Sequence, residues 1–346
     1  MRILKIILIV SPLLLLPPYY LQSRIDLSYW SLVPLLLIST FTFSFPLFRG
    51  KKWVKLSYLA MGIMSFLVVC FLLRDLIGLV TQYYLSPLLT LAIAVSSTGI
   101  GLWWGRKPRV KKVTIKIDGL PEKLKGLSII QISDLHVGAN ITEKYVSQVM
   151  EECNLLQPHL IVMTGDIGDS EASIHEKELR SFKQLIAPLG IFYVPGNHEY
   201  YWNTQEWVEV MKRIKAIPLL NEGQIIHYQG ENILMAGITD PIDRKNPPDL
   251  RKPLQNIQET SLKILLSHRP DPAQLADQLG YHLQLSGHTH GGQFFPWTLA
   301  VKVIHKHHLG LFTQGKLKIY VSGGTGSWGP LLRLGSSPEI TYITLN

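Results

Sequence analysis

The chain has 346 residues, a formal net charge of +9 and only two cysteines, Cys70 and Cys153. Two cysteines in such different segments exclude a disulfide framework and a metal site built from thiolates. The positive charge is compatible with nucleic-acid binding, but much of it flanks apolar segments, which favours a role in membrane topology or contact with lipid headgroups.

Apolar residues are concentrated in the first third of the chain, and charged and apolar residues are mixed in the remainder. We therefore predict a transmembrane helical region over residues 1–105 and a soluble domain over residues 106–346. A helix needs about 20 apolar residues to cross a bilayer. By this criterion the sequence predicts a bundle of about four spans, at residues 6–21, 29–48, 53–73 and 83–104.

The first apolar stretch has two interpretations. It is short, it is interrupted by three prolines, and Arg2 and Lys5 precede it. A short apolar core that follows positive residues is typical of a signal peptide. No small-residue cleavage site follows it, so an uncleaved first helix is the preferred interpretation.

The distribution of Lys and Arg predicts the orientation of the helices. Positive residues cluster before the first span, around the second loop and after the fourth span, whereas the other two loops carry only Arg24 and Arg74. Because positive residues are retained on the cytoplasmic side, both ends of the helical region are expected there. The prediction is a multi-pass membrane protein, in the inner membrane if the source is a bacterium, with a cytoplasmic catalytic domain.

After residue 110, short apolar runs alternate with amphipathic segments, which is typical of packed α/β layers. The runs predict strands at residues 127–132, 160–164, 191–194, 233–238, 262–266 and 282–285. The amphipathic segments predict helices at residues 142–157, 176–187, 204–215 and 272–279. Thr142 and Thr204 are the expected N-caps of two of these helices.

Polar side chains that can bind metal ions follow five of the predicted strands. In chain order they are Asp134 and His136, Asp166 and Asp169, Asn197 and His198, His268, and His288 and His290. Open α/β sheets bind ligands at the carboxyl ends of their strands, so we expect these side chains to converge. Any one of them alone is more often a cap or a satisfied core residue, but that alternative must hold at five places together.

The predicted donors are oxygen and imidazole groups without thiolates, a set suited to Mn²⁺, Fe or Zn²⁺. Two such cations roughly 3.5–4 Å apart bind phosphate oxygens, lower the pKa of a bridging water and stabilise charge during in-line displacement. The donors therefore suggest two divalent metal ions, with a carboxylate between them.

In order and spacing, the segment from Asp134 to His290 resembles the calcineurin-like metallophosphoesterases, whose pattern is D-x-H, G-D-x-x-D, G-N-H-[E/D], H, G-H-x-H. The resemblance implies a four-layer α/β/β/α sandwich and a metal-dependent hydrolase, with Mn²⁺ the preferred metal. It implies one metal ion held by Asp134, His136, Asp166 and His290, and another held by Asp166, Asn197, His268 and His288. Asp166 is then the bridging ligand.

The same resemblance gives roles to two residues that do not bind metal. His198 is expected to bind the phosphoryl group or to protonate the leaving oxygen, and Asp169 to orient its ring. Residues 287–293, 320–329 and 338–339 carry a closer similarity to a membrane-associated branch related to YaeI-type phosphodiesterases. In residues 320–329, the glycines are compatible with a phosphate-binding loop or with a tight turn between strands. Arg333 is either a phosphate clamp or part of a surface ion pair.

Residues 294–312 combine apolar side chains with lysines and histidines. They are compatible with a seat for acyl chains whose cations meet diphosphate or lipid headgroups, or with a β-hairpin that buries one face. His305, His307 and His308 are expected at the surface, because the ligand set is complete without them.

The expected function is hydrolysis of a phosphodiester or pyrophosphate bond in an amphiphilic or lipid-linked substrate, with membrane lipids as partners. UDP-2,3-diacylglucosamine, a substrate known in the superfamily, is a candidate suggested by the resemblance. The alternatives are a catalytically inactive membrane scaffold and a nuclease-type phosphodiesterase. A nucleic-acid partner is not expected, because the sequence has no basic groove interleaved with aromatic residues.

Overall fold

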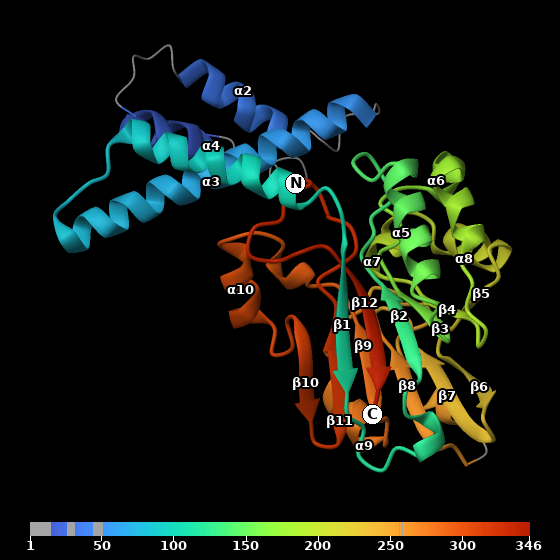
Figure 1. The fold of residues 1–346 in the computed structure, drawn as a ribbon. Coiled ribbons are helices and arrows are strands. Elements are labelled where there is room, and N and C mark those ends of the chain that lie inside the picture. The colour runs from blue at the N-terminus through green and yellow to red at the C-terminus, as the bar shows by residue number, and fades with distance from the viewer. Residues whose placement is uncertain (1–14, 26–31, 44–50, 256, 258) are drawn as a thin grey trace. The chain divides into compact units, whose positions relative to one another are not determined.

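The protein forms two compact units in the computed structural model, which describes residues 15–25, 32–43, 51–255, 257 and 259–346 (Figure 1). The first unit comprises Met1–Arg106 together with Gly329–Leu334. The second comprises Lys107–Trp328 and Gly335–Asn346.

The first unit is helical. Residues 15–25 form a helix, followed by α2 (Leu32–Phe43), α3 (Lys51–Thr81) and α4 (Pro87–Trp104). Among the described residues, α3 and α4 are the two helices long and apolar enough to cross a membrane. The four predicted spans are therefore not confirmed: the first two lie partly outside the described residues, and α2 has only 12 residues.

Helix α3 extends beyond the third predicted span, which ends at residue 73. Helix α3 continues to Thr81 and has 31 residues, so it is about 46 Å long, against a hydrocarbon core of about 30 Å. The extension carries Arg74 and Asp75. One Asp75 oxygen lies 2.7 Å from Nε of Arg24, and the other lies 3.1 Å from Nη1 of Arg74. The excess length allows this ionic cluster to lie beyond the apolar region.

Gly329–Leu334 is a short segment from the end of the chain that packs within the helical unit. The backbone N–H of Arg333 donates to the carbonyl of Gly101 at 3.0 Å. A Cβ on Gly62 would lie only 2.2 Å from the Leu332 side chain, so a larger residue at position 62 would have to displace this leucine. Because Arg333 is fully buried, the alternative of a surface ion pair is excluded.

The second unit contains two six-stranded sheets. The first has the order β1 (Arg109–Ile115), β12 (Glu339–Leu345), β2 (Ser128–Ile132), β3 (Leu160–Thr164), β4 (Ile191–Val194), β5 (Ala216–Pro218). The second has the order β10 (Gly310–Gln314), β11 (Leu317–Val321), β9 (Leu283–Ser286), β8 (Leu262–Leu266), β7 (Glu231–Gly237), β6 (Glu222–Tyr228). Strands β2 to β5 are parallel to one another, as are β7, β8, β9 and β11.

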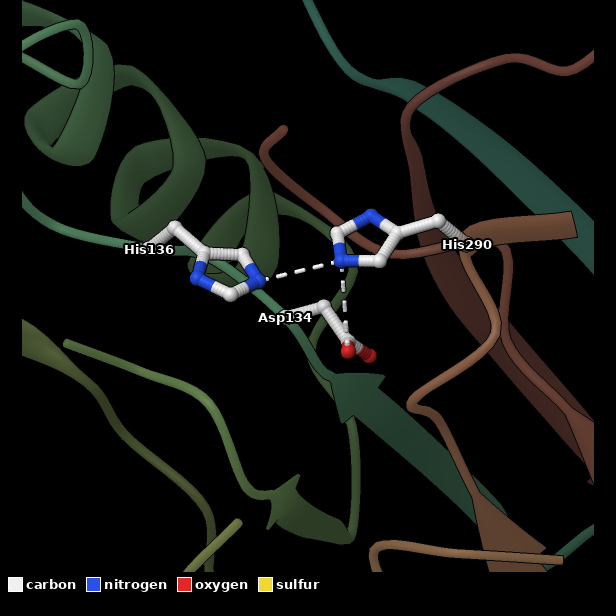
Figure 2. Close-up of side chains that lie close together, drawn as sticks. All are labelled: Asp134, His136 and His290. Atoms are coloured by element: carbon white, nitrogen blue, oxygen red, sulfur yellow. Dashed lines mark hydrogen bonds and ion pairs between the residues drawn. The ribbon is translucent and has the colours of Figure 1, made fainter. Parts of the chain in front are cut away.

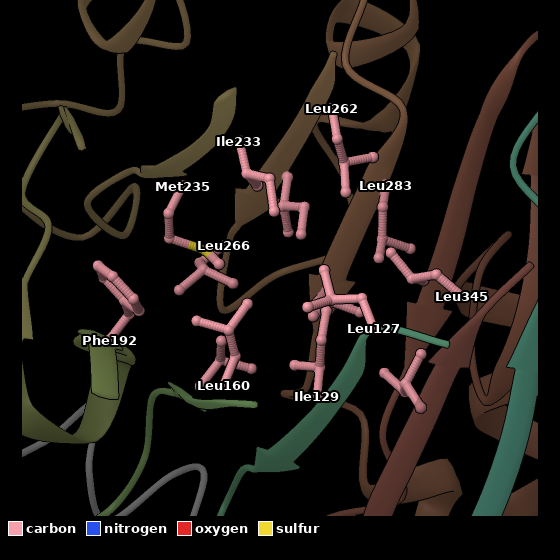
Figure 3. Close-up of a cluster of buried hydrophobic side chains, with 14 of the residues drawn as sticks. Leu127, Ile129, Leu160, Phe192, Ile233, Met235, Leu262, Leu266, Leu283 and Leu345 are labelled. Carbon is pink, nitrogen blue, oxygen red and sulfur yellow. The ribbon is translucent and has the colours of Figure 1, made fainter. Parts of the chain in front are cut away.

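The sheets pack face to face through one apolar core. Ile129 and Leu160 of the first sheet meet Met235, Leu266 and Leu283 of the second (Figure 3). Strands β2 and β3 are buried along their whole length and β8 at all but one residue, which explains why these strands are mostly apolar in the sequence. The α/β layers predicted from the sequence are thus confirmed.

Helices flank the sheets (Figure 1). They are α5 (Glu143–Leu155), α6 (Glu176–Arg180), α7 (Asn197–Tyr201), α8 (Thr204–Arg213), α9 (Ala273–Gln278) and α10 (Trp297–Ile304). Short 3-10 helices lie at Glu122–Leu124, Ala172–His175, Ser181–Gln184, Lys252–Leu254 and His290–Gly292. Helix α9 covers the outer face of the second sheet, where its alanines join a second apolar cluster.

The six predicted strands are confirmed as β2, β3, β4, β7, β8 and β9, and three of the four predicted helices as α5, α8 and α9. The helix predicted at residues 176–187 is too long, because α6 ends at Arg180 and a 3-10 helix follows at Ser181–Gln184. Thr142 caps α5 by accepting from the N–H of Tyr145 at 3.4 Å. Thr204 is not a cap, because Asn203 accepts from the N–H of Glu206 and so begins α8 one residue earlier.

For two segments of the C-terminal region, one of the two alternatives is excluded. Residues 294–312 do not form a β-hairpin, because helix α10 precedes strand β10. Residues 320–329 do not form a tight turn either, because β11 ends at Val321 and β12 begins only at Glu339. The Val and Ile content of α10 resembles that of a strand, which explains why the sequence left a β-hairpin open for residues 294–312.

A substitution of Leu266 tests whether the two sheets share one core. Leu266→Ala is expected to lower the free energy of unfolding of the second unit by about 2–5 kcal/mol, because it leaves a cavity between the sheets. Urea titration of the purified protein, followed by tryptophan fluorescence, measures the change. Leu155→Ala is the control, since this leucine is 77% exposed. Equal midpoints for the two variants contradict the expected packing.

Candidate metal centre

The structure brings all nine predicted site residues together at the carboxyl ends of strands. The first sheet supplies residues after β2, β3 and β4: Asp134, His136, Asp166, Asp169, Asn197 and His198. The second sheet supplies residues after β8 and β9: His268, His288 and His290. The site therefore forms only when the two sheets pack with these strand ends at one edge.

Asp134, His136 and His290 form one group of potential metal ligands (Figure 2). Nε2 of His136 lies 3.0 Å from Nε2 of His290, which in turn lies 3.5 Å from an Asp134 oxygen. The three side chains are buried and point toward one another (Figure 2). Their donor atoms are close enough to surround a single cation.

Asp166, His268 and His288 form a second group. Nε2 of His268 lies 3.3 Å from Oδ2 of Asp166 and 3.2 Å from Nδ1 of His288. The amide oxygen of Asn197 is 3.1 Å from the same His268 nitrogen. This group contains the donors that the resemblance assigned to the second metal ion.

Asp166 lies between the two groups. Its Oδ2 is 3.3 Å from His268 of the second group and 3.9 Å from Nε2 of His136 in the first. Its Oδ1 accepts a hydrogen bond from the backbone N–H of His198 at 2.8 Å. A carboxylate in this position can reach cations on both sides.

His198 and Asp169 form a pair beside the metal ligands. Nδ1 of His198 lies 2.7 Å from Oδ1 of Asp169, while Nε2 of His198 lies 3.9 Å from Oδ2 of Asp166. The rings of Tyr201 and Trp328 contact the His198 ring, with centroids 5.3 and 6.4 Å away. The ring is therefore held by one carboxylate and by aromatic neighbours.

Five of the candidate ligands have left-handed backbone conformations. Their φ angles are +50° to +52° at Asp134, His136, Asp166 and His290, and +72° at His288. Residues other than glycine rarely adopt this region, and such conformations concentrate at functional sites. The turns point successive side chains into one small volume.

Two glycines allow the loops to approach the carboxylates. A Cβ on Gly196 would lie 2.2 Å from an Asp166 oxygen, and a Cβ on Gly287 would lie 2.2 Å from an Asp134 oxygen. Neither distance is compatible with a side chain. These glycines therefore set how closely the loops after β4 and β9 pack on the site.

Burial and charge shift the pKa values of the site in opposite directions. Burial lowers the pKa of His136 to about 4 and that of His288 to about 3, so both rings are neutral and offer a lone pair. Burial alone would also disfavour a proton on His268, but the neighbouring Asp166 and Asp134 carboxylates raise its pKa to about 10. Despite its burial, Asp166 has a pKa well below its usual range because of the imidazoles of His268, His136 and His198.

The arrangement fits two divalent cations. Neutral imidazole nitrogens and carboxylate oxygens converge within buried groups, and no cysteine takes part. The other ring nitrogen of His268, Nδ1, is 2.8 Å from the carbonyl of Thr164, which fixes the orientation that leaves Nε2 for a metal.

The family is shown by comparison with known proteins. A model described as calcineurin-like phosphoesterase matches residues 127–292, a span that contains all nine site residues. An uncharacterized metallophosphoesterase of Bacillus subtilis is 31% identical over 240 residues, which are 67% of this chain and 83% of that protein. The chain belongs to the calcineurin-like metallophosphoesterase family.

Other metallophosphoesterases match a smaller share of their own length. One from Campylobacter jejuni is 34% identical over 245 residues, 69% of this chain and 64% of that protein. A transmembrane protein with a metallophosphoesterase domain from Bos taurus is 32% identical over 278 residues, 75% of this chain and 62% of that protein. The chain thus spans just under two thirds of the length of these two relatives.

The sequence did not reveal the role of Glu199 in this metallophosphoesterase. Its buried carboxylate accepts hydrogen bonds from the backbone N–H groups of Asp166 at 2.9 Å, Gly168 at 2.9 Å and Gly196 at 2.7 Å. Burial, followed by the charge of Asp166, raises its pKa to about 7. Only the bond to Gly196 had a sequence signal, because a glutamate at the third helical position often bonds the N-cap.

Glu199 is expected to hold the loops after β3 and β4 together. Glu199→Gln turns one acceptor into an N–H donor that faces backbone donors, which costs about 1–3 kcal/mol. We expect a lower melting temperature and weaker Mn²⁺ binding, measured by differential scanning calorimetry and isothermal titration calorimetry. Glu209→Gln, at a half-exposed residue on α8, is the matched control. Unchanged melting and Mn²⁺ affinity in Glu199→Gln would show that the loops do not depend on this carboxylate.

Proposed function

We propose that the protein is a membrane-anchored hydrolase that uses two divalent metal ions to cleave a phosphodiester or pyrophosphate bond in an amphiphilic substrate. The observation that carries the proposal is the position of Asp166 between two groups of metal donors, with His198 beside them. Family membership supports phosphoester hydrolysis as the reaction class.

The proposed ligand division follows the two groups of donors. Asp134, His136 and His290 hold one cation, His268, His288 and Asn197 hold the other, and Asp166 bridges them. When bound, the two cations supply Lewis-acid stabilisation of phosphate oxygens and an activated water. In this proposal both ions are Mn²⁺, although the same donors also suit Fe and Zn²⁺.

His198 is proposed to donate a proton to the leaving oxygen. Burial disfavours its charged form, but the hydrogen bond that His198 donates to Asp169 and the charge of Asp166 raise its pKa overall. Asp169 holds Nδ1 and so leaves Nε2 facing the metal donors, where a phosphoester would lie. A histidine in this state both hydrogen-bonds a phosphoryl oxygen and acts as a general acid.

Membrane anchoring is proposed from α3 and α4, which are long and apolar enough to cross a bilayer. The contact between Arg24 and Asp75, next to Arg74, supports the predicted topology, which places Arg24 and Arg74 on the same side of the membrane. The cluster of positive residues after α4 then faces the cytoplasm together with the catalytic unit.

Two substitutions separate metal binding from proton transfer. Asp166→Ala is expected to lose bound metal and Mn²⁺-dependent turnover of bis-(p-nitrophenyl) phosphate together, because it removes the shared ligand. His198→Gln is expected to keep its metal content but to lose about 10²–10⁴-fold in turnover. Metal analysis and turnover in detergent measure both effects. Unchanged turnover in Asp166→Ala would overturn the proposed site.

A panel of substrates tests whether the enzyme prefers an amphiphilic one. The panel contains UDP-2,3-diacylglucosamine, a glycerophosphodiester, a phospholipid, a phosphomonoester and single-stranded DNA, each with Mn²⁺ and purified protein. We expect the acylated phosphodiester or pyrophosphate to have the largest kcat/KM. Preference for DNA would favour a nuclease, and no turnover of any compound would favour an inactive scaffold.

A further inference from the structure

Helix α10 exposes a row of large apolar side chains. Val303 is 88% exposed, Ile304 72%, Leu299 52% and Trp297 51%, and no residue of the helix is buried. Leu299 and Val303 are four residues apart and Trp297 and Ile304 seven, so they form two pairs that together span somewhat less than half of the helix circumference. Leu311, on strand β10 nearby in the chain, adds a further exposed apolar side chain.

The same segment carries positive charge. The sequence from residue 294 to residue 314 contains Lys302 and Lys306 and no Asp or Glu. Lys302 and Lys306 are exposed at the end of α10 and just beyond it. A helix with Trp and aliphatic residues on one side and lysines at its edge is typical of segments that lie in a lipid interface.

The segment is attached directly to the loop that carries His288 and His290. Thr289 donates a hydrogen bond from its hydroxyl to the carbonyl of His308 at 2.5 Å. The His288 and His305 rings are in contact, with centroids 6.1 Å apart. A Cβ on Gly292 would lie 2.4 Å from the backbone of Trp297, so α10 begins against the turn that follows His290.

We propose that α10 is a membrane-interface helix, which inserts its apolar side at the headgroup level of an anionic bilayer and places its lysines against lipid phosphates. The chain carries its own candidate spanning helices, so a bilayer is available to α10 at high effective concentration, and even a short helix can bind. The metal centre then lies at the depth where the phosphate groups of lipids are found. This consequence for the substrate rests on the proposed function, whereas the membrane contact does not.

A second copy of the chain fits the surface less well. The helix has eight residues and is about 12 Å long, whereas a stable dimer buries about 800 Å² on each partner. Two copies meeting at α10 would also bring like-charged lysines together. A bilayer has neither difficulty, because its headgroups are anionic and its acyl chains accept an apolar patch of any size.

A spin label at residue 303 tests the proposal. The full chain carries Val303→Cys together with Cys70→Ser, since the remaining Cys153 is buried, and it is placed in nanodiscs that contain phosphatidylglycerol. Collision of the label with oxygen, which partitions into lipid, is compared with collision with a water-soluble nickel chelate. Leu155→Cys, at another strongly exposed aliphatic residue, is the matched control.

We expect oxygen to be favoured at residue 303 and the nickel chelate at residue 155. Favoured collision with the nickel chelate at both residues would overturn the proposal. So would protection from both reagents at residue 303, which indicates a protein partner, or a disulfide-linked dimer of Val303→Cys, which indicates a second copy. The measurement needs no turnover, so an inactive protein with oxygen favoured at residue 303 would reject the hydrolase and retain the membrane contact.

A charged substitution on α10 tests whether the membrane contact contributes to activity. Val303→Asp is expected to reduce turnover of a phospholipid-embedded substrate several-fold while turnover of bis-(p-nitrophenyl) phosphate stays the same, with Leu155→Asp as the control. Equal loss with both substrates would show that α10 only supports the structure of the metal centre. An unchanged rate with the embedded substrate would show that the membrane contact does not serve catalysis.

Discussion

The buried carboxylate of Asp166 is the point where the two sheets depend on each other. Its oxygens meet imidazoles from both sheets, and its own backbone N–H is bound by Glu199. A charge buried so completely is stable only with compensating charges and hydrogen-bond donors around it. Those partners follow β2, β4 and β8, so the sheets must pack with these strand ends at one edge.

The loops around this carboxylate are held by strain and close packing. Left-handed residues turn the ligands inward, Gly196 and Gly287 allow close approach, and Glu199 joins the loops after β3 and β4. Each feature costs conformational freedom, and together they fix the donor atoms before a cation arrives. Such preorganisation is what a metal centre needs to bind and act on a phosphoester without large rearrangement.

The region after His290 connects this centre to other parts of the protein. Helix α10 is fixed to the loop of His288 and His290 through Thr289 and Gly292, so its position and that of two ligands are coupled. Further along, Trp328 contacts the His198 ring, and the chain then enters Gly329–Leu334, which packs within the helical unit. The placement of these two candidate ligands is therefore coupled to that of α10.

The sequence by itself determined several buried strands and the candidate metal donors. Strands β3 and β4 are apolar at nearly every residue because parallel central strands are buried on both faces, and candidate donors follow them. Edge strands such as β1 and β10 mix polar and apolar residues without a clear period, so the sequence did not predict them. The length of α3 and the helix at α10 were also misjudged, because apolar content alone fixes neither the end of a helix nor its type.

Only the tertiary structure decided how these parts act together. The hydrogen bonds of Glu199 to Asp166 and Gly168 join residues more than 30 positions apart, and no local pattern predicts which backbone amides will face one carboxylate. The same holds for Gly329–Leu334, which lies late in the chain but packs with the N-terminal helices. Local sequence specifies donor types and strand periods, whereas distances between donors depend on how distant strands pack.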